Sequence, residues 1–567
     1  MLLVDSSGRA GLAVCRSLGS KGITVDIGRL GVPTIAEKSA FASSVFRLGD
    51  PREDGVQSII QTMRELLTQH RYDLLIPITD GACEICSLGR SIIEERAKVA
   101  LPMDSSYEYS HNKEMTLEVA SQLDVPIPKY ETLHKLSDIR RFYSLNYFPC
   151  YLKPIYSAKI IDNRLATFRV KKICRPEELE EYCRAHLGSV PLMVQEVCGG
   201  IGAGIYLLAD KGKILSIVQQ IRLHEPELGG GSSYRMTAEI DPCLQDYAQR
   251  IIATINWTGV AMIEFKGTPG TSEWKLMEIN GRFWGSLALT ISSGLDFPLW
   301  LYQLYNEKPI AASMKTPTID FRQRNLKKDL GWLLKTLRAS ENKLKTFLSW
   351  VRDFKYVLLA NEKFDSEQLR DPLPAIYDWL YLLRPLFHGA RRRIWKERCK
   401  FRYSRQKKTL LGEMQRILQQ ESRNLLFVCK GNIIRSPFAE QYCKQRYGIR
   451  AVSSVGVLPR SNRMVPLLAE EIAKETFGID LTGHRSTILD EATARWADLI
   501  FVMDYSNLAE LWKHHYPYKP VLLLGDVDHQ GEIQDPHPYL ASDGESRVYS
   551  TYKSIAFSID ELHLDDV

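Results

Sequence analysis

Apolar and polar positions alternate along the first hundred residues in a way that predicts strands and helices in turn. Leu2–Val4 is a short apolar run, and a small-residue turn separates it from a helical pattern over residues 12–21. Another apolar run, residues 74–78, ends just before Asp80. Strand–helix alternation of this kind indicates a parallel sheet, whose ligands bind beyond the carboxyl ends of its strands.

From about residue 110 to residue 312 the pattern is richer in strands. Residues 147–154 and 191–197 are short apolar runs, and the first of them carries a lysine near its end. Residues 260–265 and 274–280 are expected to form a pair of strands with acidic side chains near their ends. This part of the chain is therefore predicted to be an α+β domain.

A helical pattern rich in Leu, Trp, Lys and Arg occupies residues 320–421, with a break at Asp371–Pro374. Residues 320–385 are expected to pack on the preceding domain, because their large apolar side chains would otherwise be exposed. These side chains are Trp332, Leu333, Trp350, Trp379 and Leu380. At Asn424 a new strand–helix alternation begins and continues to the end of the chain, which indicates a second α/β module.

The composition is that of a folded protein with several domains. The chain has 567 residues, 44% of them hydrophobic and 25% charged, which excludes collagen-like and wholly disordered proteins and predicts roughly two to four domains. It has no run of about 18 apolar residues and no basic leader, so neither a membrane-spanning helix nor a signal peptide is expected. Eleven cysteines without paired spacing favour free thiols in a reducing, cytoplasmic setting.

Positive charge is concentrated in one stretch of the chain. Residues 390–408 contain ten Lys or Arg and one Glu, a net charge of +9, whereas the whole chain carries +6. Trp395, Phe401 and Tyr403 interleave with these basic residues. The pattern fits either a solvated helix face or a peripheral contact with an anionic membrane. No nucleic-acid-binding fold is recognisable beside it, so nucleic acid is not an expected partner.

The second α/β module opens on a segment with the properties of a phosphate-binding loop. Its residues 425–437, LLFVCKGNIIRSP, place Cys429 at the end of an apolar strand and Arg435 at the start of a helix. A loop that leads into a helix N-terminus turns backbone N–H groups inward and cradles an anion. Arg435 would stabilise a thiolate at Cys429 and grip phosphate oxygens, so that the thiolate can attack phosphorus. Asp535, on a loop after a later strand, is the best candidate for the acid that protonates the leaving group.

Residues 424 to about 560 resemble the low-molecular-weight protein tyrosine phosphatase family. Further stretches that match lie at residues 452–456, 478–485 and 497–504. The resemblance implies hydrolysis of phosphomonoesters, phosphotyrosine among them, through a thiophosphate intermediate on Cys429. It also implies a side-chain network that supports the phosphate loop, at Asn432, Ser436, His484 and Ser454. Many members carry a second cysteine next to the arginine, where this chain has Ile434.

Polar side chains at strand ends in the first module suit a divalent metal and a nucleotide. Glu264, Glu278 and Asn280 supply the hard oxygen ligands that Mg²⁺ prefers, usually together with nucleotide phosphates. Lys113 and Lys153 could pair with those phosphates. A glycine-rich loop, residues 228–233, could close over the phosphates, and Arg282 could hold an anionic intermediate.

Together these features of residues 1 to about 320 resemble the ATP-grasp superfamily, in particular carbamoyl-phosphate-synthase-like carboxylate–amine ligases. The resembling stretches are residues 111–113, 151–154, 194–196, 260–265 and 277–283. The resemblance implies that Lys113 and Lys153 contact ATP and that Gln195, Glu196 and Val197 form the adenine hinge. It further implies that Glu264, Glu278 and Asn280 bind Mg²⁺, or Mn²⁺ in its place, and that Arg282 steadies an acyl phosphate.

The sequence thus predicts an α/β multidomain protein with two catalytic modules. The expected domains are a Rossmann-like domain that precedes ATP-grasp (1–110), an ATP-grasp α+β domain (111–319), a helical extension and basic connector (320–421), and a doubly wound parallel-sheet phosphatase domain (422–567). The expected substrates are a small-molecule carboxylate, an amine and ATP for the ligase, and a phosphorylated protein or small-molecule phosphate for the phosphatase. The alternative is a phosphatase that carries a nucleotide-sensing or scaffolding ATP-grasp module without ligase activity.

Overall fold

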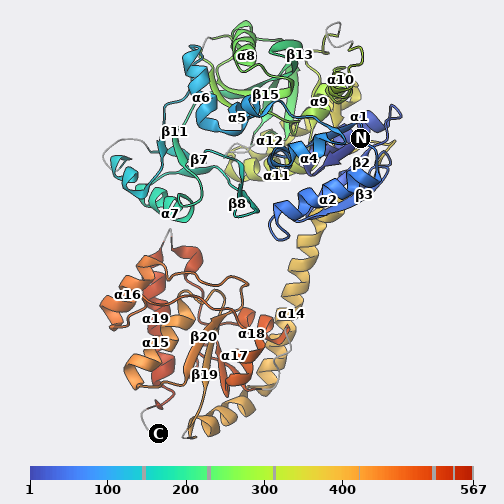
Figure 1. The fold of residues 1–567 in the computed structure, drawn as a ribbon. Helices are drawn as coiled ribbons and strands as arrows, with labels where there is room; N and C mark the ends of the chain where they lie inside the picture. The colour runs from blue at the N-terminus through green and yellow to red at the C-terminus, as the bar shows by residue number, and fades with distance from the viewer. Residues whose placement is uncertain are drawn as a thin grey trace. The chain divides into compact units, whose positions relative to one another are not determined.

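The structure, a computed structural model, describes residues 1–142, 148–225, 231–271, 273–310, 315–420, 422–513, 519–540 and 543–564. The chain divides after Leu382 into two compact units, and each unit has its own hydrophobic core (Figure 1). The predicted fold class, a mixed α/β multidomain protein, is confirmed.

The first unit begins with a parallel sheet in the order β3-β2-β1-β4-β5. Side chains alternate along β1, so Leu3 packs with α1 whereas Leu2 and Val4 pack with α2 on the other face. Helix α1 begins at Gly8, earlier than the predicted residue 12. Gly11 lies in its first turns against the backbone of Ser6, where a Cβ would come within 2.4 Å of a carbonyl oxygen. The elements are β1 (Leu2–Val4), α1 (Gly8–Gly19), β2 (Asp26–Leu30), β3 (Val45–Gly49), α2 (Val56–Gln69), β4 (Leu74–Pro77), α3 (Asp80–Leu88), α4 (Arg90–Glu94) and β5 (Lys98–Val99).

Two further sheets follow in the same unit, one antiparallel and one antiparallel except for the parallel pair of β17 and β18 at its edge. The smaller has the order β10-β7-β11-β6, and helix α7 (Pro176–His186) contributes to its core. Its strands are β6 (Tyr130–Leu133), β7 (Cys150–Pro154), β10 (Lys171–Ile173) and β11 (Leu192–Glu196), and a separate hairpin joins β8 (Ala158–Ile161) to β9 (Arg164–Thr167). Helices α5 (Asp104–His111) and α6 (Lys113–Gln122) precede them.

The larger sheet has seven strands in the order β16-β15-β12-β13-β14-β17-β18. Helix α8 (Pro242–Thr254) covers it with the apolar residues Leu244, Ile251 and Ile252, all fully buried. The sheet strands are β12 (Ile201–Asp210), β13 (Lys213–His224), β14 (Tyr234–Ala238), β15 (Gly259–Gly267), β16 (Lys275–Asn280), β17 (Arg322–Arg324) and β18 (Glu362–Phe364). Helices α9 (Leu287–Ser292) and α10 (Phe297–Tyr305) lie between β16 and β17 in the chain. Helices α11 (Leu326–Ala339), α12 (Lys343–Arg352) and α13 (Lys355–Leu358) lie between β17 and β18.

Residues 320–382 belong to the first unit, as expected. Of the side chains whose burial we predicted, Leu333 is buried, whereas Leu380 is 56% exposed. The sequence pattern missed two strands there, since β17 and β18 are each only three residues long and extend the large sheet at its edge. The fully buried Arg324 of β17 pairs with Glu362 of β18 at 2.7 Å and with Asp329 at 2.6 Å. Trp350 donates its indole N–H to the same Asp329.

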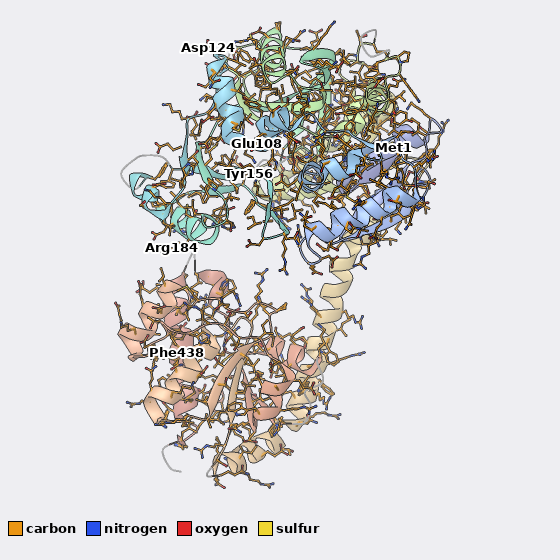
Figure 2. The ribbon with its side chains drawn as sticks, in the orientation of Figure 1. Met1, Glu108, Asp124, Tyr156, Arg184 and Phe438 are labelled. Carbon is orange, nitrogen blue, oxygen red and sulfur yellow. The ribbon has the colours of Figure 1, made fainter. Side chains whose placement is uncertain are left out.

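The second unit is built on a four-stranded parallel sheet in the order β20-β19-β21-β22. Phe427 of β19 faces the core under α15 and α19, and Val428 faces the opposite core under α18. Phe438 of α15 (Figure 2) stacks on Tyr552 of α19 with ring centroids 4.0 Å apart. The elements are β19 (Leu425–Cys429), α15 (Arg435–Tyr447), β20 (Val452–Gly456), α16 (Leu467–Phe477), α17 (Glu491–Trp496), β21 (Leu499–Val502), α18 (Tyr505–Lys513), β22 (Val521–Leu523) and α19 (Gly544–Asp560).

A single helix, α14 (Leu373–Leu418), spans the division between the units. Its later part is not a bare connector, because Tyr403 is fully buried in the core of the second unit and donates to Asp526 at 2.8 Å. Cys399 and Met414 are buried as well. The second unit therefore starts at Leu383, earlier in the chain than the expected boundary at residue 422. In the described part of the chain, no helix is long and apolar enough to cross a membrane.

Candidate active sites

The loop between β19 and α15 encloses the Cys429 thiol. The backbone N–H of Asn432 donates to Cys429 Sγ at 3.2 Å, and the Ser436 hydroxyl donates to it at 3.0 Å. Asn432 has the left-handed backbone conformation (φ 51°) that turns the loop inward, which asparagine adopts more readily than most residues. Both donors thus point at the sulfur, the atom that would attack phosphorus.

Asn432 is the centre of the network that supports this loop. Its side-chain amide donates to Ser436 Oγ at 3.1 Å and to Ser454 Oγ at 2.8 Å. Its backbone carbonyl lies 2.9 Å from His484 Nε2. The structure thus brings together all four positions expected to support the loop, and it adds Thr487, whose backbone N–H donates to Asn432 Oδ1 at 2.8 Å.

Arg435 is buried at the start of α15, beside two carboxylates. Its guanidinium pairs with Asp504 at 2.7 Å and with Asp535 at 3.4 Å. Burial opposes the charge on Arg435, but Cys429, Asp535 and Asp504 outweigh it and raise the pKa of the guanidinium. Arg435 is thus permanently cationic. Asp535 lies next to this guanidinium, which would bind the phosphate.

The first unit contains a cavity of about 1270 Å³ that holds most of the other predicted site residues. It is lined by Lys153, Glu264, Glu278, Asn280 and Arg282. The first half of the glycine-rich segment that was expected to close over phosphates, residues 228–230, lies outside the described residues. In its second half, Gly231 and Ser232 line the cavity.

Of the two lysines expected to contact ATP, Lys153 lines this cavity, whereas Lys113 is not among its lining residues. Lys153 is on β7, and Lys113 begins α6, where its ammonium donates to Ser157 at 2.8 Å. Close by, the Tyr156 hydroxyl donates to Glu108 at 3.3 Å (Figure 2). Burial lowers the pKa of both lysines, although Glu278 acts against that shift. An anion in the cavity would restore their full charge, so both are suited to bind phosphate.

Glu264 of β15 and Glu278 of β16 are directly opposite each other across the strand pair. Asn280 donates to Glu278 at 3.1 Å, and Arg222 pairs with Glu264 at 2.7 Å. Burial raises the pKa of Glu264, whereas Lys113 and Lys153 overcome the effect of burial at Glu278 and lower its pKa. Two carboxylates and an amide oxygen at one wall of a polar cavity fit Mg²⁺ or Mn²⁺, which take oxygen ligands.

Arg282 is held by Asp80, the first residue of α3, which follows strand β4 of the first sheet. Its guanidinium makes two bonds to Asp80, at 2.7 and 2.9 Å, and a third to Asn280 at 3.3 Å. Burial acts to raise the pKa of Asp80, but the charge of Arg282 prevails and lowers it. The ion pair therefore fixes Arg282 at the cavity wall.

The three expected hinge residues lie at the end of β11. Gln195 is buried, and neither polar atom of its side chain has a partner among the described residues. Glu196 accepts from Lys275 at 2.5 Å and from the backbone of Lys129 at 3.1 Å. Val197 is exposed. Of the three residues, Gln195 has buried hydrogen-bonding atoms left for a ligand.

Comparison with known proteins identifies the second unit. Residues 424–563 match the family model for low molecular weight phosphotyrosine protein phosphatase. The probable low molecular weight protein-tyrosine-phosphatase EpsP of Ralstonia nicotianae is 35% identical over 117 residues, which cover 20% of this chain and 79% of EpsP. The chain belongs to the low molecular weight protein-tyrosine-phosphatase family. The phosphatase Etp of Escherichia coli K12 is 31% identical over 120 residues, 21% of this chain and 80% of Etp.

The first unit matches a different family. Residues 189–328 match the family model described as ATP-grasp in the biosynthetic pathway with Ter operon. A solved structure, an L-amino acid ligase from Bacillus licheniformis, aligns with a TM-score of 0.43 and 14% identity over 55% of this chain and 75% of that chain. The two family-model matches confirm the predicted fusion of an ATP-grasp module to a phosphatase of this family.

Three charged residues of these sites had no role in the sequence prediction. Asp504 follows β21, whose carboxyl end lies beside that of β19, so its position in the parallel sheet was a usable signal. Asp80 follows β4 in the same way. Arg222 had no such signal. It reaches Glu264 past Gly202 of the intervening strand, where a Cβ would lie 3.0 Å from the Arg222 side chain.

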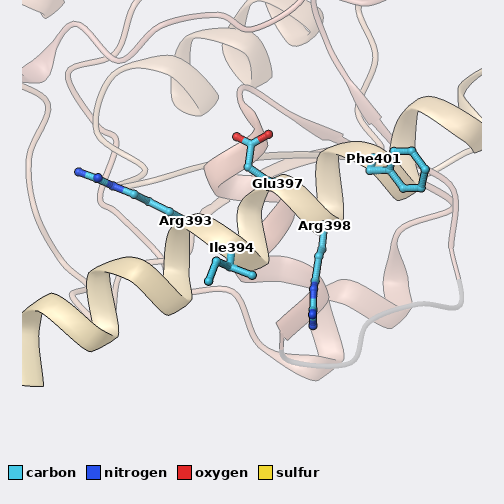
Figure 3. Close-up of a pocket in the computed structure, with 5 residues that line it drawn as sticks. All are labelled: Arg393, Ile394, Glu397, Arg398 and Phe401. Carbon is cyan, nitrogen blue, oxygen red and sulfur yellow. The ribbon is translucent and has the colours of Figure 1, made fainter.

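The basic stretch expected to contact a membrane lies on α14, within the phosphatase unit. Two of its three aromatic residues serve the fold: Tyr403 is buried, and Trp395 donates to the Ala509 carbonyl at 2.8 Å. Ile394 and Phe401 are 56% and 64% exposed, and Ile394 and Arg398 project from the same side of the helix (Figure 3). The membrane contact stays a prediction that now depends on two apolar side chains instead of three aromatic ones.

Proposed function

We propose that the chain is a bifunctional enzyme: an ATP-dependent ligase that joins a carboxylate to an amine through an acyl phosphate, fused to a phosphomonoesterase that uses Cys429. The observation that carries the ligase proposal is the convergence of anion-binding and metal-binding side chains on one cavity. Lys153, Glu278 and Arg282 line it together. A module that only binds a nucleotide would not need all three of these side chains, because Arg282 serves the acyl phosphate and not the nucleotide.

The side chains of the ligase cavity divide between nucleotide and intermediate. Lys113 and Lys153 bind ATP phosphates, and Gln195 and its neighbours Glu196 and Val197 bind the adenine. Mg²⁺, or Mn²⁺, bound by Glu264, Glu278 and Asn280 would neutralise charge on the phosphoryl group as it is transferred. Arg282, held by Asp80, stabilises the negative charge of the acyl phosphate until the amine displaces inorganic phosphate.

The phosphatase reaction follows from the geometry around Cys429. The thiolate attacks phosphorus while Arg435 and the loop N–H groups hold the phosphate oxygens. Asp535 gives its proton to the leaving oxygen, and the same carboxylate then takes a proton from the water that hydrolyses the thiophosphate. Phosphotyrosine in a protein and a small phosphomonoester are both candidate substrates. The free cysteines favour a cytoplasmic location for the enzyme.

ADP release by the full chain, measured with a panel of acids and amines, tests the ligase proposal. The Cys429→Ser variant is the protein to use, because it removes phosphate release by the phosphatase. ADP release that requires both an acid and an amine supports the proposal. Tight binding of ATP with no turnover on any pair would favour the alternative, a nucleotide-sensing module attached to the phosphatase.

A further inference from the structure

The later part of helix α14 has two opposite faces. One face carries Cys399 and Tyr403, which are buried in the second unit. An α-helix turns by about 100° per residue, so positions at alternating spacings of three and four residues share the face opposite to Tyr403. This face, here called the outer stripe, consists of Arg391, Ile394, Arg398, Phe401, Arg405 and Lys408. All six side chains are exposed.

Two large apolar side chains lie in the middle of the outer stripe. Ile394 is 56% exposed and Phe401 is 64% exposed, although the Arg405 guanidinium lies 5.0 Å from the centre of the Phe401 ring. Ile394 and Arg398 project from the same side of the helix (Figure 3). A helix face that meets only water normally carries polar residues at its outermost positions. The apolar pair therefore indicates that a partner covers this face.

The positive charge of the outer stripe is not balanced within the protein. Lys396 and Lys407, which are not part of the stripe, pair with Glu532 at 3.3 Å and with Asp526 at 2.8 Å. Among the described residues, no Asp or Glu lies within ion-pair distance of the four cations of the stripe. Glu397 is the one acid in residues 390–408. A complementary partner is therefore both negatively charged and able to take up apolar side chains.

An anionic lipid surface has both properties. Its headgroups attract exposed Lys and Arg, and the boundary between headgroups and acyl chains takes up apolar side chains. Duplex nucleic acid would engage the cations through its phosphates and leave Ile394 and Phe401 in water. A second copy of this chain would bring two positively charged stripes against each other. The combination of charge and apolar surface thus favours lipid over both of these occupants.

We propose that the outer stripe binds an anionic lipid membrane, with Ile394 and Phe401 inserted at the headgroup boundary and the four cations on the lipid headgroups. Two inserted side chains alone bind weakly, and cations alone lose their attraction in salt. The two contributions together give reversible, salt-dependent binding at the membrane surface. This contact is independent of both proposed activities, since none of the six residues belongs to either active site.

Sedimentation of the full chain with lipid vesicles tests the proposal. Vesicles of phosphatidylcholine are compared with vesicles in which about one third of the lipid is phosphatidylglycerol, at salt concentrations of about 0.1 M and about 0.5 M. We expect the anionic vesicles to bind about tenfold or more tightly than the neutral ones at the lower salt concentration, and this difference to shrink at the higher one. A chain that does not bind anionic vesicles at the lower salt concentration would overturn the proposal.

Paired substitutions separate the apolar contribution from the charge. Ile394→Ala with Phe401→Ala should weaken binding to anionic vesicles about tenfold, whereas Leu467→Ala with Phe557→Ala, at exposed apolar residues of the same unit, should not. Arg398→Gln with Arg405→Gln should weaken binding about tenfold at the lower salt concentration. Its control is Arg446→Gln with Arg450→Gln, at exposed cations of the same unit. All four variants should hydrolyse an aryl phosphate at the wild-type rate, which shows that they are folded.

Three results would contradict a lipid partner. If Ile394→Ala with Phe401→Ala binds anionic vesicles as well as the wild type does, the insertion is wrong. If duplex DNA or polyglutamate binds more tightly than anionic vesicles do, the partner is a nucleic acid or an acidic protein. If the lipid-free chain self-associates and Ile394→Ala with Phe401→Ala abolishes this, the partner is a second copy of the chain.

Discussion

The two active sites are assembled in opposite ways. The phosphatase loop takes its nucleophile, its anion cradle and its arginine from residues 429–436, and Asn432 ties the loop to its neighbours. The ligase site draws Asp80 from the start of α3, Lys153 from β7 and Arg282 from the segment after β16. The phosphatase site is thus a contiguous site, which can be recognised from a short sequence motif. The ligase site is an assembled site, which depends on how distant segments of the chain pack. Substitutions should therefore act locally in the phosphatase and through positioning in the ligase.

The largest effect is expected at the centre of the contiguous site. Cys429→Ser should lower hydrolysis of an aryl phosphate by more than about a thousandfold, because an alcohol is a far weaker nucleophile than a thiolate near neutral pH. Release of the phenol, followed by absorbance, measures this loss. Cys174→Ser, at an exposed cysteine of the other unit, is the control and should keep full activity. Substantial activity in Cys429→Ser would place the nucleophile elsewhere.

The second prediction concerns the contribution of α14 to the stability of the phosphatase unit. A fragment that begins at residue 390 keeps Tyr403, with its bonds to Asp526 and to the Leu523 backbone, whereas one that begins at residue 420 loses them. Removing a fully buried aromatic side chain costs about 3–5 kcal/mol. Urea denaturation should therefore show the shorter fragment to be less stable by at least that amount. Equal stability of the two fragments would mean that α14 is a passive connector after all.

The general acid should show a smaller, substrate-dependent effect. Asp535→Asn should slow hydrolysis about 100-fold or more for an alkyl phosphate, which needs a proton on its leaving oxygen, and much less for p-nitrophenyl phosphate. The measurement is kcat on both substrates over a range of pH. Asp528→Asn, at a residue that follows β22 and accepts a hydrogen bond from Ser558, is the control. Equal losses on the two substrates would contradict the assignment of Asp535.

The activity of the assembled site should depend on Asp80, a residue that would not contact the substrate. Asp80 holds Arg282 by two bonds, so Asp80→Asn should misplace that cation and lower kcat for ADP release about 10- to 100-fold, with a smaller change in ATP affinity. Asp104→Asn, which removes a surface pair with Arg90, is the matched control and should have little effect. An unchanged kcat in Asp80→Asn would mean that Arg282 keeps its position without this partner.

The same contrast explains what the sequence could and could not predict. Cys429, Arg435 and their loop were recognisable because strand, loop and helix follow one another directly, and Asn432 matched its left-handed position by residue type alone. Glu264 and Glu278 were recognisable from two adjacent strands. Arg222 and the strand β18 could not be predicted, since the first acts across an intervening strand and the second is three residues long with its partner forty residues away. These features exist only once the large sheet has formed.

The smallest expected effect concerns oxidation of the contiguous site. Ile434 is 2% exposed and directly precedes Arg435, so the phosphate loop has no second cysteine beside its arginine. Without that second thiol, Cys429 sulfenic acid has no neighbour in the loop with which to form a disulfide, and prolonged peroxide should carry it to states that thiols do not reduce. Ile434→Cys should raise the activity recovered with dithiothreitol about two- to fivefold, because a nearby thiol condenses with the sulfenic acid. Ile434→Val, which loses packing but adds no thiol, should recover no better than the wild type.

Full recovery of the wild type would instead assign the rescue to another cysteine. Cys443 of α15 is the first to replace, although burial raises the pKa of its thiol and makes it a slow partner.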